Sequence, residues 1–259
     1  MSERVDQFLL SEISRHARAS GEVLDLPCGD GALSKLLDAA GFSVTPADLF
    51  PEALSWAGRT AVAADMNRRL PFDDDRFDAV VSQEGVEHLE HLASFVSECA
   101  RVLRPGGQIW ITTPNFMDLS SRLSFFLTGM KSFHAGFPNE VTTLWGRDGE
   151  RVYHGHAFTL PFFQVRYLLR VFGFERVALH GLKRSTASTV LYVPVRPLAG
   201  ILVSRAFRKI ARKADRRREN REVPGDLREE LRRFALSGDL LCFRKICVHA
   251  TLASSAPGT

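Results

Sequence analysis

The sequence contains few cysteines, and no two of them have the spacing along the chain that is typical of a metal site. Its four thiols, at Cys28, Cys99, Cys242 and Cys247, form no C-x-x-C motif. This arrangement argues against a zinc site and against a disulfide framework. We therefore expect free thiols and a reducing, cytoplasmic environment.

Other missing features exclude further classes of protein. The first residues, Met1 to Asp6, are charged and contain no continuous apolar core, so we expect no signal peptide. No internal repeat is found. Of the 259 residues, 45% are hydrophobic and 25% are charged, a balance typical of a soluble globular chain. We expect one domain with an elaboration rather than two full domains.

A glycine turn between an apolar run and a helical pattern is the most informative short motif. The apolar run stops at Asp25, the turn carries Gly29 and Gly31, and residues 32–37 have helical periodicity. A strand, a glycine turn and a helix in this order build a cofactor pocket at the carboxyl end of a parallel strand. The third glycine of the dinucleotide fingerprint G-x-G-x-x-G is missing, so this motif alone does not identify the ligand.

Strand and helix signals alternate along most of the chain. This alternation predicts an α/β fold with a doubly wound, mostly parallel, seven-stranded Rossmann-like sheet, whose last strand is antiparallel. Helical patterns are found near residues 5–13, 32–37, 95–103 and 160–172. The predicted strands lie near residues 23–26, 42–48, 60–65, 77–82, 108–113, 174–180 and 240–250.

Two segments interrupt the alternation. Residues 115–157 are too long for an ordinary connection, and we expect a partly helical cap over the substrate side. An apolar and then basic helical insertion is expected before the last strand. The predicted parts are an N-terminal helix (1–20), a core (21–185) that includes the cap, the insertion (186–239), the last strand (240–252) and a tail (253–259).

Several pieces of sequence occur in a fixed order between residues 22 and 174. They are Asp25-Leu-Pro-Cys-Gly-Asp-Gly, Asp48 and Asp65 after the second and third strands, Leu70-Pro-Phe followed by Arg76-Phe-Asp, Glu84-Gly-Val-Glu-His-Leu, and Leu103-Arg-Pro-Gly-Gly. In this order and at this spacing, they resemble the class I S-adenosylmethionine-dependent methyltransferases. The resemblance implies that the cofactor is S-adenosyl-L-methionine.

The resemblance also implies roles for individual residues. Asp25 would face the amino acid end of the cofactor, while Gly29 and Gly31 let the backbone approach it. Asp48 would accept hydrogen bonds from the two ribose hydroxyls. The remaining residues that the resemblance assigns to the cofactor site are Pro27, Cys28, Leu49, Asp65, Met66 and Gln83, with Asp65 and Met66 beside the adenine. Proline at position 27 departs from the family, which usually has glycine there.

The segment Glu84-Gly-Val-Glu87-His88 follows the fourth strand and allows two interpretations. In many methyltransferases of this class, such a segment binds no metal, its acids cap the next helix, and its histidine packs or helps catalysis. In the small-RNA 3′-terminal 2′-O-methyltransferases and the ubiquinone-pathway O-methyltransferases, it resembles a divalent metal site. On that hypothesis Glu84, Glu87, His88 and the downstream His156 bind Mg²⁺ or Mn²⁺. Under either interpretation we expect His88 to be the general base, with Glu84 beside it.

Residues 190–222 join an apolar segment to a basic one. Between Ser204 and Glu222, nine basic and three acidic residues give a local net charge of +6, against +4 for the whole chain. Three interpretations stay open: a helix packed on the fold, contact with an anionic membrane surface, and nucleic-acid binding, for which no recognised RNA-binding module is present. The apolar segment contains two prolines and an arginine, and we expect it to be too short to cross a membrane.

Oxygen is the expected methyl acceptor, on a small molecule, a glycan or a lipid-linked compound. The predicted cap also resembles methyltransferases that act on bacterial surface glycans or lipid-linked substrates. Three alternatives remain open: an RNA 2′-O-methyltransferase, a methyltransferase acting on nitrogen or carbon of a small molecule, and a cofactor-binding protein without activity. The expected location is the cytoplasm, with peripheral contact to the inner face of the membrane if the basic segment binds lipid.

Overall fold

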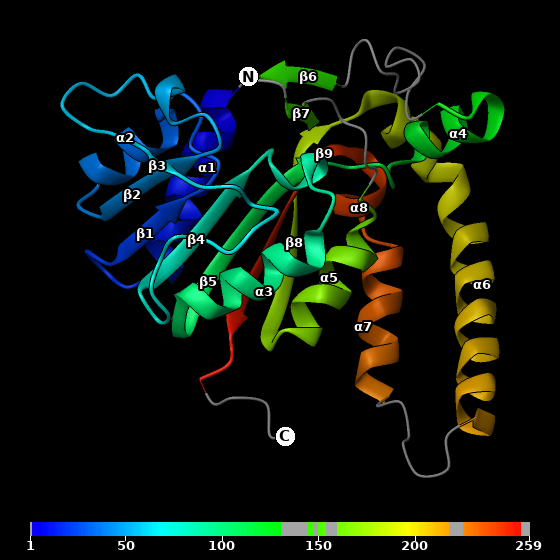
Figure 1. Ribbon diagram of the computed structural model, residues 1–259. Helices are drawn as coiled ribbons and strands as arrows, with labels where there is room; N and C mark the ends of the chain where they lie inside the picture. The colour runs from blue at the N-terminus through cyan, green and yellow to red at the C-terminus, as the bar shows by residue number, and fades with distance from the viewer. Residues whose placement is uncertain (1, 131–143, 148–149, 154–159, 218–224, 255–259) are drawn as a thin grey trace. The chain divides into compact units, whose positions relative to one another are not determined.

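The computed structural model describes residues 2–130, 144–147, 150–153, 160–217 and 225–254 (Figure 1). The chain folds into two compact units. The first contains residues 1–114, 138–178 and 247–259, and the second contains residues 115–137 and 179–246. The expected ligand His156 lies outside the described residues.

Seven strands form one sheet, in the order β3-β2-β1-β4-β5-β9-β8. The strands β3, β2, β1, β4 and β5 pair in parallel. Along β5 and β9 the partners run in opposite directions, because Asn115 N–H donates to the Arg244 carbonyl while Gln108 contacts His249. The predicted fold class, with its antiparallel last strand, is confirmed. The strands are β1 (Glu22–Asp25), β2 (Ser43–Asp48), β3 (Val62–Ala63), β4 (Phe77–Gln83), β5 (Leu103–Pro114), β8 (Phe174–Arg184) and β9 (Phe243–Leu252).

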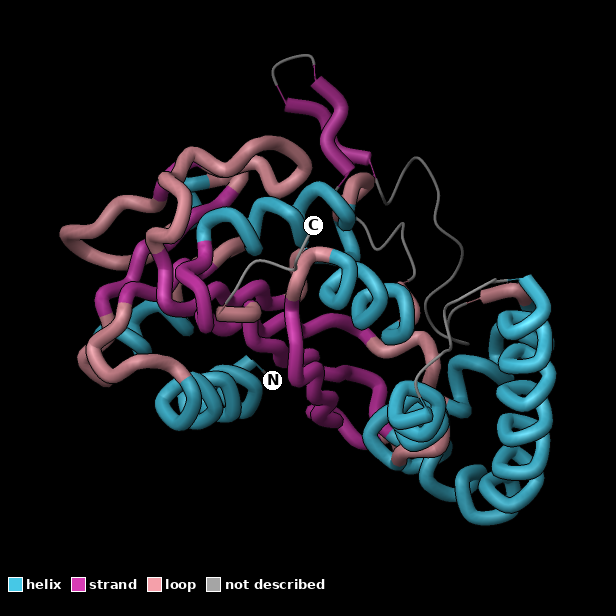
Figure 2. The backbone as a smooth tube through the Cα atoms, turned by 90° about the horizontal axis from the view of Figure 1, so that it is seen from below, coloured by secondary structure: helices cyan, strands magenta, loops and turns pink. Residues whose placement is uncertain are grey.

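Helices cover both faces of this sheet in the first unit (Figure 2). On one face lie α1 (Ser2–His16) and α2 (Ala32–Ala39), and on the other lie α3 (Leu92–Val102) and α5 (Phe162–Val171). The covered strands are apolar without alternation, as residues 79–81 of β4 and 109–111 of β5 show, since all six side chains are fully buried. A separate antiparallel hairpin is formed by β6 (Leu144–Arg147) and β7 (Glu150–Tyr153).

The start of the last strand differs from the prediction. Residues Gly238–Cys242 form the short helix α8, and β9 begins only at Phe243. The hydroxyl oxygen of Ser237 accepts a hydrogen bond from the Leu240 N–H, which caps the first turn of this helix. The run of apolar residues that follows Asp239 looks like a strand in sequence, but its first part belongs to a capped helix.

The second unit is built mainly from helices. Its longest helices are α4 (Leu119–Thr128), α6 (Thr186–Arg217) and α7 (Gly225–Ala235). Residues Thr186–Ala206 of α6 are the one described helical stretch that is long and apolar enough to cross a membrane by length and composition, with a mean hydropathy of 1.4. The expectation that this segment is too short was wrong, because α6 continues through Pro194 and Pro197.

Candidate cofactor site

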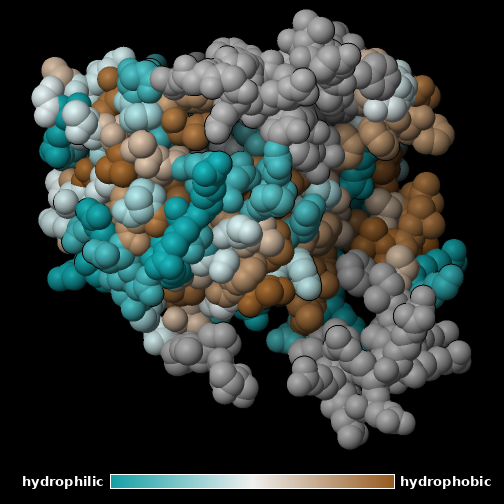
Figure 3. Space-filling view, in the orientation of Figure 1, coloured by the Kyte–Doolittle hydropathy of each residue, from teal (hydrophilic) through white to brown (hydrophobic). Residues whose placement is uncertain are grey.

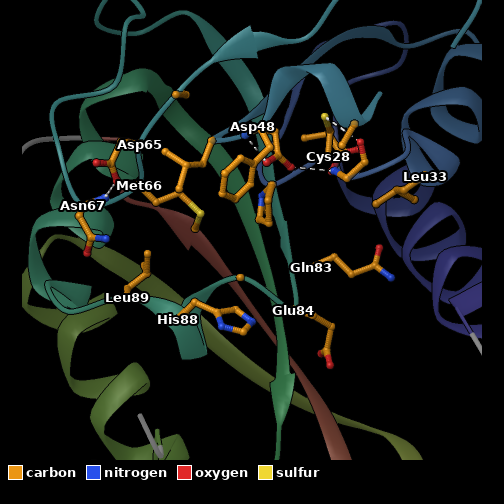
Figure 4. A pocket seen from close by; sticks show the side chains of 18 of the residues that line it. Cys28, Leu33, Asp48, Asp65, Met66, Asn67, Gln83, Glu84, His88 and Leu89 are labelled. Atoms are coloured by element: carbon orange, nitrogen blue, oxygen red, sulfur yellow. Dashed lines mark hydrogen bonds between the residues drawn. The ribbon is translucent and has the colours of Figure 1, made fainter. Parts of the chain in front are cut away.

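A pocket of about 940 Å³ opens at the carboxyl ends of the parallel strands in the first unit (Figure 4). Its volume lies within the range of sites that enclose a cofactor or a drug-sized molecule. Strands β1, β2 and β4 end at this edge of the sheet with Asp25, Asp48 and Gln83, which all line the pocket. The topology thus gathers side chains that are far apart in sequence.

Asp48 is held in a fixed orientation at the end of β2. One carboxylate oxygen accepts the Gly29 N–H at 2.9 Å, and the other accepts the Phe50 N–H at 2.9 Å. Because a carboxylate offers about four acceptor sites, two remain for a ligand that donates hydroxyl hydrogens. Asp48 is therefore a preorganised acceptor for a diol.

The turn after β1 lies against Asp48. Cys28 N–H donates to the Ala47 carbonyl at 2.9 Å, which ties this turn to β2. Gly29 has a φ of +53°, which favours glycine, and the position of a Cβ on it has no neighbour within 4 Å. Burial and the nearby Asp25 and Asp48 carboxylates raise the pKa of the Cys28 thiol to about 12, so this thiol is neutral.

Gly31 has a structural reason to be glycine that the sequence analysis did not give. It is not among the residues that line the pocket. Its φ is +78°, and a Cβ on it would lie 2.5 Å from Cδ1 of Leu54. Gly31 therefore allows the chain to turn into α2 and to pack against Leu54.

Asp25 is a buried carboxylate at the floor of the pocket. Ser34 of α2 donates its hydroxyl to Asp25 at 2.6 Å. Removal from water, together with the negative charges of Asp6 and Asp48, raises the pKa of Asp25 to about 7, although the hydrogen bond from Ser34 opposes this rise in part. A cationic ligand in the pocket would favour the ionised carboxylate, because it would bring an opposite charge close to it.

Asp6 is a pocket residue that the sequence analysis missed. It lies on α1, is only 3% exposed, and accepts a hydrogen bond from the Gln83 side-chain amide at 2.8 Å. A signal for it exists in the sequence: Asp6 shares a helical stripe with Leu9 and Ile13, both fully buried.

The opposite end of the pocket is formed by the loop after β3. Met66 and Leu89 provide buried apolar surface there, beside Asp65 (Figure 4). Asp65 accepts the Asn67 N–H at 2.8 Å, and Asn67, another residue that the sequence analysis missed, accepts the N–H groups of Glu90 and His91 through its side-chain oxygen. These contacts hold two loops together around an apolar slot suited to a flat ring.

The segment after β4 places Glu84 and His88 on the pocket lining (Figure 4). Glu84 has a φ of +52°, a strained conformation for a residue other than glycine. It accepts a hydrogen bond from the Thr112 hydroxyl at 3.2 Å. Gly85 fits closely against the turn after β1, since a Cβ on it would lie 2.5 Å from Cδ of Pro27.

Glu87 faces away from this lining. Its side chain is buried, with 1% exposure, and accepts a hydrogen bond from the Thr113 hydroxyl at 3.2 Å. Among the described residues, no group of three or more histidine, cysteine or acidic side chains could hold a metal ion. The predicted convergence of Glu84, Glu87 and His88 on one ion is therefore not seen, and the fourth predicted ligand, His156, lies outside the described part of the chain.

The alternative role of the two acids is not seen either. Helix α3 begins after His91, and no side chain caps its first turn. Glu87 instead belongs to the short 3₁₀ helix η2 (Val86–His88), which turns its side chain into the protein. This turn separates Glu87 from Glu84 and His88.

A comparison with known families identifies this arrangement. The profile of a family described as "Methyltransferase domain" matches residues 24–111, which run from β1 to β5 and include the strand ends described above. Residues 24–111 carry the methyltransferase domain that this profile describes. This methyltransferase domain lies wholly within the first unit.

Curated relatives resemble a part of the chain. The chain is 34% identical over 133 residues to the mitochondrial ubiquinone biosynthesis O-methyltransferase of Mus musculus, an alignment that covers 46% of this chain and 36% of the relative. It is 34% identical over 116 residues to the ubiquinone biosynthesis O-methyltransferase of Xylella fastidiosa strain M23, covering 41% of this chain and 47% of the relative. The chain thus spans about a third to a half of the length of these relatives.

A solved structure shows the fold over nearly the whole chain. The chain resembles a SAM dependent methyltransferase from Archaeoglobus fulgidus with a TM-score of 0.55 and 17% identity, and 95% of this chain and 94% of that chain are covered. At this identity the likeness shows the fold.

The pocket of the methyltransferase domain suits S-adenosyl-L-methionine. Asp48 offers acceptors for a ribose, Asp25 and Asp6 offer negative charge for an ammonium group, and the slot at Met66 and Leu89 offers apolar surface for an adenine. Of the predicted cofactor residues, all but one line the pocket: Asp25, Pro27, Cys28, Gly29, Asp48, Leu49, Asp65, Met66 and Gln83 do, and Gly31 does not. Their contacts with the cofactor stay predictions.

Proposed function

We propose that this protein transfers the methyl group of S-adenosyl-L-methionine to a hydroxyl oxygen of a small-molecule, glycan or lipid-linked acceptor. The observation that carries the proposal is the position of His88. Its half-buried imidazole lies on the lining of the pocket, on the segment between β4 and α3 that also holds Glu84. The names of the relatives, which are O-methyltransferases, support oxygen as the acceptor atom.

The residues of this chain would hold the cofactor and remove one proton. Asp48 binds the ribose, and Asp25 with Asp6 binds the ammonium group. When bound, the cofactor supplies a methyl group on a positively charged sulfur. His88 would accept the proton that the acceptor hydroxyl loses when its oxygen takes up the methyl group. Glu84 lines the same pocket four residues before His88, and its negative charge would favour the protonated imidazole.

Transfer of a labelled methyl group tests this proposal. The protein is incubated with methyl-labelled S-adenosylmethionine and with acceptors that offer a phenolic hydroxyl, a sugar hydroxyl or an amine. We expect label on a hydroxyl compound and a loss of roughly 10²–10⁴-fold in kcat for His88→Ala, with little change in cofactor affinity. His91→Ala is the control, because this histidine also lines the pocket but has no proposed role in proton transfer.

Two results would contradict the proposal. Label found only on the amine would make this an N-methyltransferase. Equal losses of kcat in His88→Ala and His91→Ala would argue against His88 as the base. Removing the proton acceptor should lower kcat more than removing another histidine of the pocket.

A further inference from the structure

The second unit exposes a cluster of large apolar side chains. Of the thirteen large hydrophobic residues that are exposed in the described part of the chain, nine lie on α4 and α6. Three of them are more than two-thirds exposed: Phe126 at 84%, Val193 at 74% and Val190 at 68%. We call this cluster the α4–α6 surface; it consists of Leu123, Phe125, Phe126, Leu127, Val190, Val193, Leu198, Ile201 and Leu202.

A buried polar contact holds the two helices together. Asp118 is fully buried at the start of α4 and accepts hydrogen bonds from the Ser120 and Ser121 N–H groups. Ser188 of α6 donates its hydroxyl to the same carboxylate, and its oxygen accepts the Ser120 N–H at 3.0 Å. The α4–α6 surface is therefore a fixed feature of the second unit and does not depend on a chance alignment of two helices.

One side of α6 changes from apolar to basic along its length. Val190, Val193, Pro197 and Ile201 are exposed and follow one another at intervals of three or four residues, which places them on the same side. The same interval leads from Ile201 to Arg205 and then to Arg208, both exposed. Figure 3 shows the apolar side chains gathered over α4 and the first part of α6, with hydrophilic ones further along α6.

The opposite side of α6 packs against other residues of the second unit. Leu191, Tyr192 and Val195 pack against a buried cluster that includes Leu241, and the Tyr192 hydroxyl donates to the Leu236 carbonyl at 3.2 Å. A helix that crossed a bilayer alone would have to leave these contacts. The contacts favour a helix that lies along a surface with one side buried in the protein and the other presented outward.

We propose that the α4–α6 surface docks this protein on a membrane that contains anionic lipids. The nine apolar side chains enter the boundary between headgroups and acyl chains, and the basic end of α6 binds the headgroup phosphates. The exposed basic residues Arg205, Arg208 and Lys209 complement an anionic surface. A second copy of the chain would bring an equal positive charge to the interface, and nucleic acid would not need so much aliphatic surface.

Sedimentation with vesicles tests the docking. Vesicles made of phosphatidylcholine alone are compared with vesicles of equal parts phosphatidylcholine and phosphatidylglycerol. We expect binding to the anionic vesicles that weakens as salt is raised, because charges are screened within about 10 Å at 0.1 M ionic strength. Replacing Arg205, Arg208 and Lys209 together by glutamine is expected to weaken this binding on the order of 100-fold.

A second variant tests the apolar part of the surface. Phe126→Ser combined with Val193→Ser removes the two most exposed apolar side chains and should lower vesicle binding by about tenfold or more. The matched control is Tyr167→Ser combined with Val171→Ser, which removes two exposed apolar residues from α5 in the first unit. Because all four residues are exposed, the melting temperature should stay unchanged in both variants.

Four outcomes would overturn the proposal. Equal binding to neutral vesicles without salt dependence would remove the role of the basic segment. An equal loss of vesicle binding in the α5 control would show that binding does not depend specifically on the α4–α6 surface. Absence of vesicle binding, together with a dimer that dissociates in Phe126→Ser/Val193→Ser, would identify the surface as a subunit interface. Binding to RNA, but not to vesicles, that is lost in the arginine and lysine variant would assign the basic segment to nucleic acid.

Discussion

The ionisation of Asp25 links the pocket to pH. Asp25 titrates at about 7 in the folded protein, well above the value near 4 expected in an unfolded chain. Between these two values the folded state holds more protons than the unfolded state. Asp25 therefore contributes stability that is fully present below about pH 4 and is lost as the pH rises toward 7.

Cofactor affinity should show the opposite dependence on pH. S-adenosylmethionine carries an ammonium group and a sulfonium, which favour the ionised form of Asp25. We expect affinity to rise by up to about tenfold per pH unit below pH 7 and to level off above it. Calorimetry between pH 5 and pH 8.5, in buffers with different ionisation enthalpies, measures both the affinity and the proton released.

Two neighbours of Asp25 provide a directional control. Ser34 donates a hydrogen bond that lowers the pKa of Asp25. In Ser34→Ala, the pH at which cofactor affinity levels off should therefore be higher. Asp6 raises that pKa by its negative charge, so Asp6→Asn should move the plateau to lower pH. Asp25→Asn should show no rise below pH 7. A dependence that survives in Asp25→Asn would assign the titration to another group.

At the scale of elements, the close contact between two turns supports the site. A Cβ at Gly85 would lie 2.5 Å from Cδ and 2.8 Å from Cγ of Pro27. Because the proline ring cannot move away by rotating a side chain, Gly85→Ala must shift one of the turns. We expect a loss of roughly 1–3 kcal/mol in the free energy of unfolding, measured by denaturant titration.

Gly200→Ala is the matched control for this prediction. Gly200 lies inside α6, and a Cβ on it has no neighbour within 4 Å. Alanine there should be neutral or slightly stabilising, because glycine is the poorer helix former. The double variant Gly85→Ala/Pro27→Ala should regain part of the lost stability. If Gly85→Ala has the same free energy of unfolding as the wild type, the contact with Pro27 does not exclude a side chain at position 85.

The ends of the strands could be predicted from the sequence. The directions of the side chains in the turn that follows β4 could not. The apolar runs that stop at Asp25, Asp48 and Gln83 reflect strands buried on both faces, so their ends could be located to within a residue or two. The spacing of Glu84, Glu87 and His88 does not encode the 3₁₀ turn that rotates Glu87 into the protein. A short turn is decided by its tertiary contacts, such as the hydrogen bond from Thr113.

Side-chain caps fix the starts of two helices, of which only α8 differs from the prediction, because a partly helical segment was expected where α4 lies. Asp118 caps α4 inside the segment that was expected to be a cap insertion, and Ser237 caps α8 where a strand was predicted. Both signals are present in the sequence, since Asp and Ser are favoured at such positions. They are outweighed in sequence by the apolar residues that follow them, which fit a helix or a strand equally well over so short a length.

At the scale of the whole molecule, the family match lies in one of the two units. The family match from residue 24 to residue 111 lies in the first unit, and the alignments with the two relatives cover less than half of the chain. Helices α4, α6 and α7 belong to the second unit. Binding of S-adenosylmethionine in the pocket of the first unit can therefore be tested without knowledge of the methyl acceptor.

Titration calorimetry of S-adenosylmethionine with the full chain and with Asp48→Ala tests this binding most directly. Asp73→Ala serves as the control, because Asp73 is an exposed acid that does not line the pocket. A hydrogen bond to a charged group contributes about 1.5–3 kcal/mol, so the account predicts that Asp48→Ala binds the cofactor roughly tenfold or more weakly. It also predicts that Asp73→Ala binds like the wild type. Absence of binding by the wild type, or an unchanged affinity in Asp48→Ala, would contradict the account.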